Sequence, residues 1–482
     1  MDTTLPDAFA PAPISSSVGY GINDTLAGAA GGETTASRIR VDEPPKLDLE
    51  PYIDNYTGRT RFHRLYLIGT TSTVLAVDAL KQAVAEAKSG KDIALYEKAV
   101  RALVEVAPDE EGASLDSAWV QEIQKGVRSQ TDRLEHELRG YKNNLIKESI
   151  RMGNEDLGNH YYETGDLIAA SKAYTRMREH CTTPSHVSSM LFKLIGVSIE
   201  RGDWLTAQSY VHRLRNAQSK PEDLAQNQPK MSVALGLAQM SQGSYLEAAN
   251  SFLSVSASLG DTYQDVISPN DVAVYGGLCA LASMDRTELQ LRVLDNTSFR
   301  PFLELEPHIR RAITFFCNSK FRPCIEILEA YRADYLLDIH LQPHVSAIYT
   351  QIRVKAIHQY LVPFSKATLD SMAATFAPNE VGQRIGLESP FLQELIRLIQ
   401  DDVLDVRIDL EHGLLVRNQH DLRAEMQTEA LEQVKAFNEE LHWRMMAAAV
   451  VNAGLQVPAP PPAERGWRPD SNDPRFPPPG SG

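Results

Sequence analysis

Alternating apolar and polar residues toward the C-terminal end of the chain predict a β-hairpin. Val406, Ile408 and Leu410 alternate with charged residues, which is the period of a half-buried strand. Residues 411–413 read Glu-His-Gly, a turn composition in which the glycine can adopt a positive φ. Residues 414–417, which include Leu415 and Val416, would then return as the second strand.

Helices are predicted immediately before this hairpin. Ser389 suits an N-cap and Pro390 suits a first helical position. The buried face of that helix is predicted to consist of Leu392, Leu395, Ile396 and Ile399. A shorter helix is predicted to open at residues 365–368, with Met372 and Phe376 on its inner side. With the helix that runs to residue 360, the order is three helices followed by a two-stranded ribbon, which is typical of a winged helix.

A pattern of glycines and of small-then-large apolar residues repeats through the middle of the chain. Turn glycines recur at Gly165, Gly202 and Gly243. Each is followed by a small and then a larger apolar residue, in the pairs Ala170 and Tyr174, Ala207 and Val211, and Ala248 and Phe252. Glycine lets two helices turn back, alanine lets them approach, and the larger side chain fills the gap to the next pair. With a period of about 34 residues, this pattern predicts about three tetratricopeptide (TPR)-like units.

Apolar residues at helical spacing predict further helices on both sides of the repeats. Three short helices are expected between residues 47 and 107, followed by one long helix from about 116 toward 151. Helices are also expected from residue 272 to residue 360. The fold class is therefore all-α with a small winged-helix element.

One more long helix is predicted after the hairpin, at about residues 421–451. Its apolar residues recur at spacings of three to five and form one stripe, comprising Leu422, Met426, Leu431, Val434, Phe437, Leu441 and Met445. Two interpretations remain open for this stripe. It could dock back on its own domain, or it could join a helical bundle with other proteins.

Composition narrows the class of protein. The 482 residues suggest about three domains at ~150 residues each. A formal net charge of −15 disfavours nucleic acid or an anionic membrane as the main partner. No signal peptide is recognisable, and the apolar run at residues 445–457 is too short for a membrane span. Four cysteines in apolar helical contexts are expected to be buried and reduced: Cys181, Cys279, Cys317 and Cys324.

Catalytic and metal-binding motifs are not found in the sequence. It contains no phosphate-binding glycine loop, nucleophile elbow or zinc-protease motif. His340 and His344 are four residues apart, but Pro343 between them argues against a helical metal-ligand face. We therefore expect no enzyme activity, no cofactor and no metal.

Nucleic-acid binding is a second interpretation of a winged helix, and the charges disfavour it. The helix at 389–400 offers Arg397, which Glu394 and two following aspartates oppose. The hairpin adds Arg407 and Arg417 but also three acidic residues. Non-specific DNA binding uses on the order of 6–10 phosphate contacts from basic residues, so the balance here is too acidic.

Particular stretches of the sequence resemble a known family. They are Leu47-Asp-Leu-Glu-Pro-Tyr52, the run from Val272 to Ala282, residues 302–307, Leu336-Leu-Asp338, residues 343–345 and residues 349–353. These stretches are similar to PCI-domain proteins. Their residues resemble those of the subunit-one family of the COP-nine signalosome, of the fungal type. The proteasome-lid subunit of the same architecture is an alternative, and a nucleic-acid-binding PCI adaptor is an alternative of another class.

The resemblance implies a non-catalytic scaffold that supports the removal of a ubiquitin-like modifier from cullins by a metal-bearing sibling subunit. It implies PCI and metalloprotease-type sibling subunits and cullin-RING ligase components as partners, no membrane, and a location in the nucleus and cytoplasm. It also assigns subunit-interface roles. The winged-helix edge would use Val406, Ile408, Leu410, Leu415 and Val416, and the C-terminal helix would use Leu431, Val434, Phe437, Leu441 and Met445.

The expected domain organisation follows from these patterns. A disordered tail at 1–45 precedes a helical region at 46–151 and TPR-like repeats at 152–265. A PCI domain follows at 266–420, with its winged helix at about 345–418. The chain ends with a bundle helix at 421–455 and a proline-rich disordered tail at 456–482.

Overall fold

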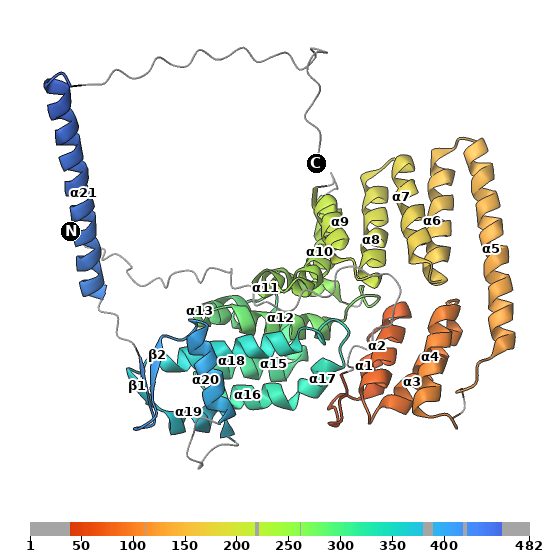
Figure 1. The fold of residues 1–482 in the computed structure, drawn as a ribbon. Helices are drawn as coiled ribbons and strands as arrows, with labels where there is room; N and C mark the ends of the chain where they lie inside the picture. The colour runs from red at the N-terminus through yellow and green to blue at the C-terminus, as the bar shows by residue number, and fades with distance from the viewer. Residues whose placement is uncertain are drawn as a thin grey trace, which may run out of the picture. The chain divides into compact units, whose positions relative to one another are not determined.

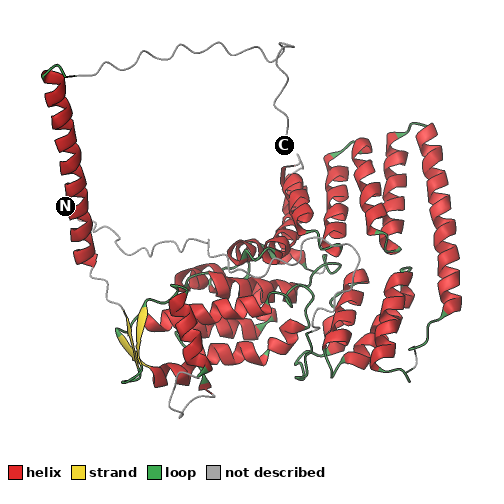
Figure 2. Ribbon diagram, in the orientation of Figure 1, coloured by secondary structure: helices red, strands yellow, loops and turns green. Residues whose placement is uncertain are grey.

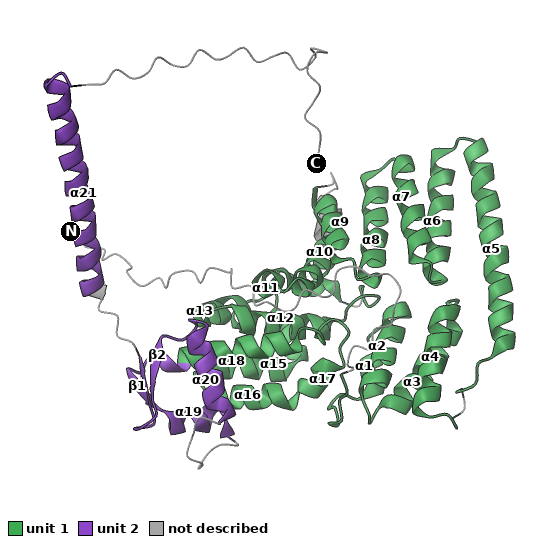
Figure 3. Cartoon of the chain, viewed as in Figure 1, with its two compact units in different colours: residues 1–359 green, residues 360–482 purple. Residues whose placement is uncertain are grey.

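The computed structural model describes residues 39–110, 112–216, 221–260, 262–378, 389–417 and 422–455. Most of these residues are helical, with a small three-stranded sheet toward the C-terminal end (Figure 2). This confirms the predicted fold class. The chain divides into two compact units, residues 1–359 and residues 360–482 (Figure 3). The predicted tails lie outside the described residues, except for residues 39–45.

Four helices pack together at the start of the first unit (Figure 1). They are α1 (Leu49–Ile53), α2 (Gly58–Thr71), α3 (Ala76–Ser89) and α4 (Ile93–Val106). Val41, in the segment predicted to be a tail, is buried in their core and forms a parallel bridge with Ser72. The same core includes Ala333 and Leu337, so these helices pack against a segment from the other end of the unit.

The long helix predicted from residue 116 to 151 is two helices, α5 (Ser117–Asn143) and α6 (Lys147–Glu163). The prediction of one continuous helix is wrong because the chain turns at Leu145, which has a φ of 54°. The two helices share a small core of Leu134, Leu138, Ile150 and Leu157. Folding back buries apolar surface that a single extended helix would leave in water.

Three helix pairs follow the predicted repeat. They are α6 with α7 (Leu167–Met177), α8 (Pro184–Glu200) with α9 (Trp204–Asn216), and α10 (Pro221–Ser241) with α11 (Tyr245–Leu253). Short 3₁₀ turns, η1 (Arg178–His180) and η2 (Ala257–Leu259), follow α7 and α11. The predicted turn glycines all have positive φ, at 87°, 68° and 77°. Helices α6 and α7 approach closely, because a Cβ added at Gly158 would lie 2.4 Å from the Tyr174 ring.

A fourth turn of the same kind has serine in place of glycine. It joins α15 (Pro307–Cys317) to α16 (Phe321–Ala330), and Ser319 has a φ of 56°. Ser319 N–H donates to the Phe316 carbonyl at 3.0 Å, and Lys320 N–H donates to the Phe315 carbonyl at 2.8 Å. The turn at Gly243 is closed by the same two bonds, from Gly243 to Met240 and from Ser244 to Gln239. The repeat therefore continues beyond the three units predicted from glycines.

The first unit continues after the repeats with α12 (Pro269–Ser283), which is buried on nearly every side and packs against α11, α14 and α15, and with further helices. They are α13 (Arg286–Glu288), the π-helix η3 (Leu289–Leu294), α14 (Arg300–Leu305), α15, α16 and α17 (Arg332–Leu336), and α18 (Val345–Leu361) then leads to the second unit. Glycine permits this burial. A Cβ added at Gly277 would lie 2.3 Å from the Ile309 side chain.

The second unit contains a winged helix and a separate long helix. Its elements are β1 (Lys366–Thr368), α19 (Leu369–Phe376), α20 (Pro390–Gln400), β2 (Val406–Asp409), β3 (Leu414–Arg417) and α21 (Leu422–Asn452). The sheet is antiparallel with β3 in the centre, in the order β1-β3-β2. Leu415 pairs with Ala367 on one side and with Ile408 on the other.

Two details of the winged helix differ from the prediction. Residues 366–368 form β1 and do not open the first short helix, because they pair with β3; α19 then starts at Leu369 with Thr368 as its N-cap. In α20 the Ser389 hydroxyl accepts from Leu392 N–H, as predicted. Its buried face consists of Phe391, Leu392, Leu395 and Leu398, with Ile396 and Ile399 half-buried at its margin. Among the described helices, none combines the length and apolar character that crossing a membrane requires.

Candidate functional site

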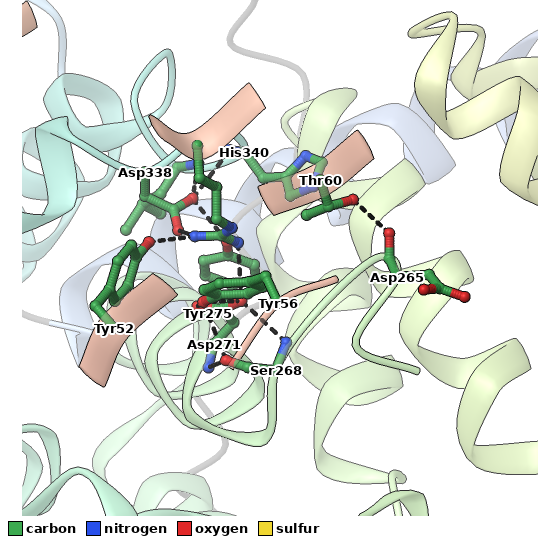
Figure 4. Close-up of polar contacts among 11 residues, drawn as sticks. Tyr52, Tyr56, Thr60, Asp265, Ser268, Asp271, Tyr275, Asp338 and His340 are labelled. Atoms are coloured by element: carbon green, nitrogen blue, oxygen red, sulfur yellow. Dashed lines mark hydrogen bonds and ion pairs between the residues drawn. The ribbon is translucent and has the colours of Figure 1, made fainter. Parts of the chain in front are cut away.

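A buried cluster of charged and phenolic side chains joins three distant segments of the first unit (Figure 4). Its centre is Arg64 of α2, which has no solvent exposure. The guanidinium donates to Asp338 Oδ2 at 2.6 Å and to Asp271 Oδ2 at 2.8 Å. It also donates to the hydroxyls of Tyr52 and Tyr275. We call this cluster the junction; its members are Tyr52, Tyr56, Arg64, Asp271, Tyr275, Asp338 and His340.

Each carboxylate of the junction is held by its own element. Asp271 belongs to the capping box of α12, in which its backbone N–H donates to the Ser268 hydroxyl. The Tyr56 hydroxyl lies 2.8 Å from both Asp271 carboxylate oxygens. Asp338 Oδ1 accepts from the backbone N–H groups of His340 and Leu341 at 2.9 Å, and from the Tyr275 hydroxyl at 2.6 Å. Each carboxylate therefore has hydrogen-bond partners other than Arg64.

One cation faces two carboxylates, so the junction carries an excess negative charge. Burial, together with the negative charge of Asp338, raises the pKa of Asp271 to about 6 against the opposing effect of Arg64. Burial also opposes ionisation of Asp338, but Arg64 and the backbone donors outweigh it and hold the pKa of Asp338 below its ordinary value. Burial lowers the pKa of His340 to about 4. At neutral pH, the imidazole of His340 is therefore uncharged where it borders the junction.

Several residues of the junction belong to the sequence stretches on which the family resemblance depends. Tyr52, Tyr275 and Asp338 come from three of those stretches, and the structure brings them together around Arg64. The cluster is not visible in the sequence because its hydrogen-bonded partners are far apart along the chain, with Arg64 and Asp338 separated by 274 positions. One local signal existed, since Arg64 lies one helical turn before the fully buried Ile68 and next to Leu65. A charge on a buried helix face needs a partner.

A cavity of about 350 Å³ lies beside the junction, and His340 lines both. Two ionisable side chains that line the cavity, His63 and Glu200, already interact with each other. Glu200 lies 3.2 Å from His63 Nε2 and 3.5 Å from Arg59 Nε, and Arg59 also pairs with Asp92 at 2.7 Å. Burial opposes ionisation of Glu200, but His63 and Arg59 together lower its pKa. These contacts fix α2 against α4 and α8.

The histidines and cysteines singled out in the sequence have structural contacts. His340 packs edge-on to Trp204 and Tyr275, and His344 Nδ1 lies 3.3 Å from the Tyr245 hydroxyl. Three cysteines are buried, but Cys181 is half-exposed, which corrects the prediction for that residue. Among the described residues, no group of three histidine, cysteine, aspartate or glutamate side chains could hold a metal ion.

The winged-helix residues predicted at a subunit interface are divided between core and surface. Val406 and Leu415 are buried, Ile408 and Val416 are half-buried, and Leu410 is 47% exposed. Leu415 and Val416 lie in the central strand, whereas β2 pairs only with β3 among the described residues and forms one edge of the sheet. Asp409 fixes the turn by accepting from the N–H groups of Glu411 and His412. Of the predicted residues, only Val406 and Ile408 belong to an edge strand, β2, and Leu410 follows it.

The predicted residues of the C-terminal helix are all exposed. Leu431, Val434, Phe437, Leu441 and Met445 of α21 are between 43% and 64% exposed. Every described side chain from residue 423 to residue 455 is exposed. Beyond the predicted stripe, Trp443, Met446 and Val450 are also exposed, on the opposite side of the helix at 100° per residue. Residues 445–451 of α21 are thus apolar all round, which is typical of a helix surrounded by other helices.

Comparison with known proteins identifies the family. A family model for the 26S proteasome subunit RPN7 matches residues 116–292, and the PCI domain model matches residues 328–419. COP9 signalosome complex subunit 1 of Emericella nidulans is 60% identical over 466 residues, which cover 95% of this chain and 93% of that protein. The Arabidopsis thaliana protein of the same name is 38% identical, covering 87% of this chain and 93% of the relative.

The proteasome alternative is less well supported. The 26S proteasome non-ATPase regulatory subunit 6 of Oryza sativa is 20% identical over 75% of this chain and 88% of that protein. Identity to the signalosome proteins is higher over a larger share of the chain, and the fungal-type resemblance agrees with the Emericella match. This chain therefore belongs to the family of COP9 signalosome complex subunit 1, which carries a PCI domain.

Proposed function

We propose that this chain is a non-catalytic scaffold subunit of a signalosome complex and that its second unit carries the contacts with sibling subunits. The observation that carries the proposal is α21, a 31-residue helix whose described side chains are all exposed although many are apolar. At 1.5 Å per residue it is about 46 Å long. Exposed apolar surface of this extent is typical of an interface.

The proposal gives α21 and β2 different roles. The apolar stripe of α21 and the opposite Trp443 would enter a bundle of helices from sibling subunits. Strand β2 would offer its unpaired backbone groups, with Leu410 beside it, to a neighbouring winged helix. Partners are PCI and metalloprotease-type siblings in the nucleus and cytoplasm, and the complex would act on cullin-RING ligases. Release of the ubiquitin-like modifier would fall to the metal-bearing sibling.

Point variants of α21 test the proposal in the full chain. Phe437→Gln with Leu441→Gln keeps good helix formers in place while removing two side chains of the stripe. We expect at least a tenfold loss of the variant from complexes purified with its siblings, measured by quantitative mass spectrometry. The matched control is Glu432→Gln with Glu439→Gln, on the opposite side of the same helix, which should leave assembly unchanged.

Two results would contradict the proposal. One is full occupancy of the Phe437→Gln, Leu441→Gln variant in the complex. The other is release of the modifier from a modified cullin by the purified chain alone. A Leu410→Gln variant separates the two surfaces, because it should weaken the winged-helix contact and leave the α21 contact intact.

A further inference from the structure

The turn between α5 and α6 exposes two aliphatic side chains in an unfavourable conformation. Leu145 is 80% exposed and has a φ of 54°, and Ile146 next to it is 55% exposed. Left-handed backbone is costly for a leucine and free of strain for glycine. The turns at Gly165, Gly202 and Gly243 in the same helical array use glycine at positive φ. Leucine at this turn therefore lowers stability in the isolated chain and leaves an apolar side chain in water.

Basic residues surround this turn. Lys142 and Lys147 flank the two aliphatic side chains and are exposed. The helices of the array are antiparallel, so the C-terminal ends of α5, α7 and α9 lie at one end of it, as the turn from α5 to α6 and the link from α7 to α8 show in Figure 1. The ends of α7 and α9 add Arg176, Arg178, Arg213 and Arg215. We call the surface formed by Lys142, Leu145, Ile146, Lys147 and these four arginines the basic rim.

The six cations of the basic rim outnumber the two acidic residues beside them, Glu148 and Glu179. Among the described residues, none of the six is within ion-pair distance of a carboxylate, whereas the neighbouring Arg151 pairs with Glu148 and Glu155. The turns at the opposite end of the array carry aspartates, with Arg201 also present there. Asp166 and Asp203 cap helices there by accepting backbone hydrogen bonds. The chain as a whole has a net charge of −15, so a surface on which basic residues surround two aliphatic side chains differs from the rest of the molecule.

We propose that the basic rim is a docking surface for an acidic segment of a partner protein, with Leu145 and Ile146 entering an apolar pocket bordered by carboxylates. Charge complementarity specifies the sign of the partner, because six unpaired cations attract carboxylates and steer the encounter. The two aliphatic side chains indicate that the partner is a protein and not a nucleic acid. Single-stranded nucleic acid is bound through aromatic stacking, which Leu145 and Ile146 do not provide. This surface lies in the first unit and is separate from α21 and β2 of the proposed function.

Site-specific photo-crosslinking tests the proposal in the full chain within its own cells. A benzophenone amino acid replaces Ile146 in one strain and Leu205 in a matched control. Leu205 is 72% exposed at the opposite end of the same array. We expect Ile146 to form a protein adduct at a carboxylate-rich segment, at least tenfold above the Leu205 control. Lys142→Glu with Lys147→Glu should reduce that adduct at least tenfold.

Other outcomes overturn the proposal. They are an adduct at Ile146 no stronger than at Leu205, an adduct to nucleic acid, an adduct to a segment without net negative charge, or an adduct indifferent to the lysine reversals. Leu145→Gly then separates docking from folding. It should raise the thermal unfolding midpoint by about 2 °C by relieving the left-handed backbone, and weaken the Ile146 adduct severalfold. A fall in the midpoint with an unchanged adduct would make Leu145 a structural residue.

Discussion

Charge and hydrophobicity are distributed in opposite ways in the junction and in α21. The junction buries Arg64 and two aspartates, whereas α21 leaves Phe437 and Trp443 in water. A buried charge is costly unless its partners are fixed around it, and an exposed apolar helix gains nothing from its own chain. The first arrangement can specify how one chain folds. The second becomes favourable when another chain covers the helix.

Replacing the central cation is the strongest way to break this comparison. Arg64→Met leaves Asp271 and Asp338 buried without a cation, and we expect a loss of about 3–5 kcal/mol in the free energy of unfolding. The measurement is urea denaturation of the full chain at pH 7. The triple variant Arg64→Met, Asp271→Asn, Asp338→Asn removes all three charges together and should recover most of the loss. An Arg64→Met chain within 1 kcal/mol of the unmodified protein would show that the junction contributes little to stability.

The pH dependence of unfolding sharpens the comparison, because two groups of the junction act in opposite directions. The pKa of His340 is about 4 when folded and 6.5 ordinarily, so its contribution to stability is lost as the pH falls from 6.5 toward 4. The pKa of Asp271 is about 6 when folded and 3.8 ordinarily, so the folded state gains stability as the pH falls through the same range. Each effect is roughly 3 kcal/mol at full extent, and the two nearly cancel.

Single substitutions expose each half of this cancellation. Relative to the unmodified chain, Asp271→Asn should become less stable between pH 6 and pH 4, by roughly 2–3 kcal/mol, because it no longer takes up a proton there. His340→Asn should become more stable over the same interval by a similar amount. The measurement is the denaturation midpoint at each pH. Parallel pH curves for all three proteins would contradict the assigned pKa directions.

The sequence predicted those parts of the fold that depend on local pattern. The hairpin alternation, the Ser389 cap and the glycine turns each involve residues within one or two helical turns of one another, and all three are confirmed. The Ser319 turn was missed because the prediction relied on glycine, and serine here adopts the same positive φ. The break at Leu145 was missed for the same reason. Strand β1 was missed because three residues carry no period, and its pairing with β3 is a tertiary contact.

The candidate sites divide in the same way. The apolar stripe of α21 was visible in the sequence, and its exposure in this structure agrees with one of the two interpretations that the sequence left open. The junction was not predictable as a cluster. Taken alone in the sequence, Tyr56, Asp271 and Asp338 each look like an ordinary helix-cap or surface residue. Their side chains come together around Arg64 only when the first unit folds. A polar residue on a buried helix face, as at Arg64, is the signal to use.

The smallest expected effect concerns α21 in the isolated chain. Phe437→Gln with Leu441→Gln should change the free energy of unfolding by less than about 0.5 kcal/mol, because both side chains are exposed and glutamine is a comparable helix former. The measurement is the same urea denaturation used for Arg64→Met, made without siblings. A loss above 1 kcal/mol would mean that α21 packs on its own chain in solution, the alternative interpretation of its apolar stripe. An unchanged midpoint together with lost assembly would show that α21 affects the complex and leaves folding alone, the reverse of what we expect for Arg64.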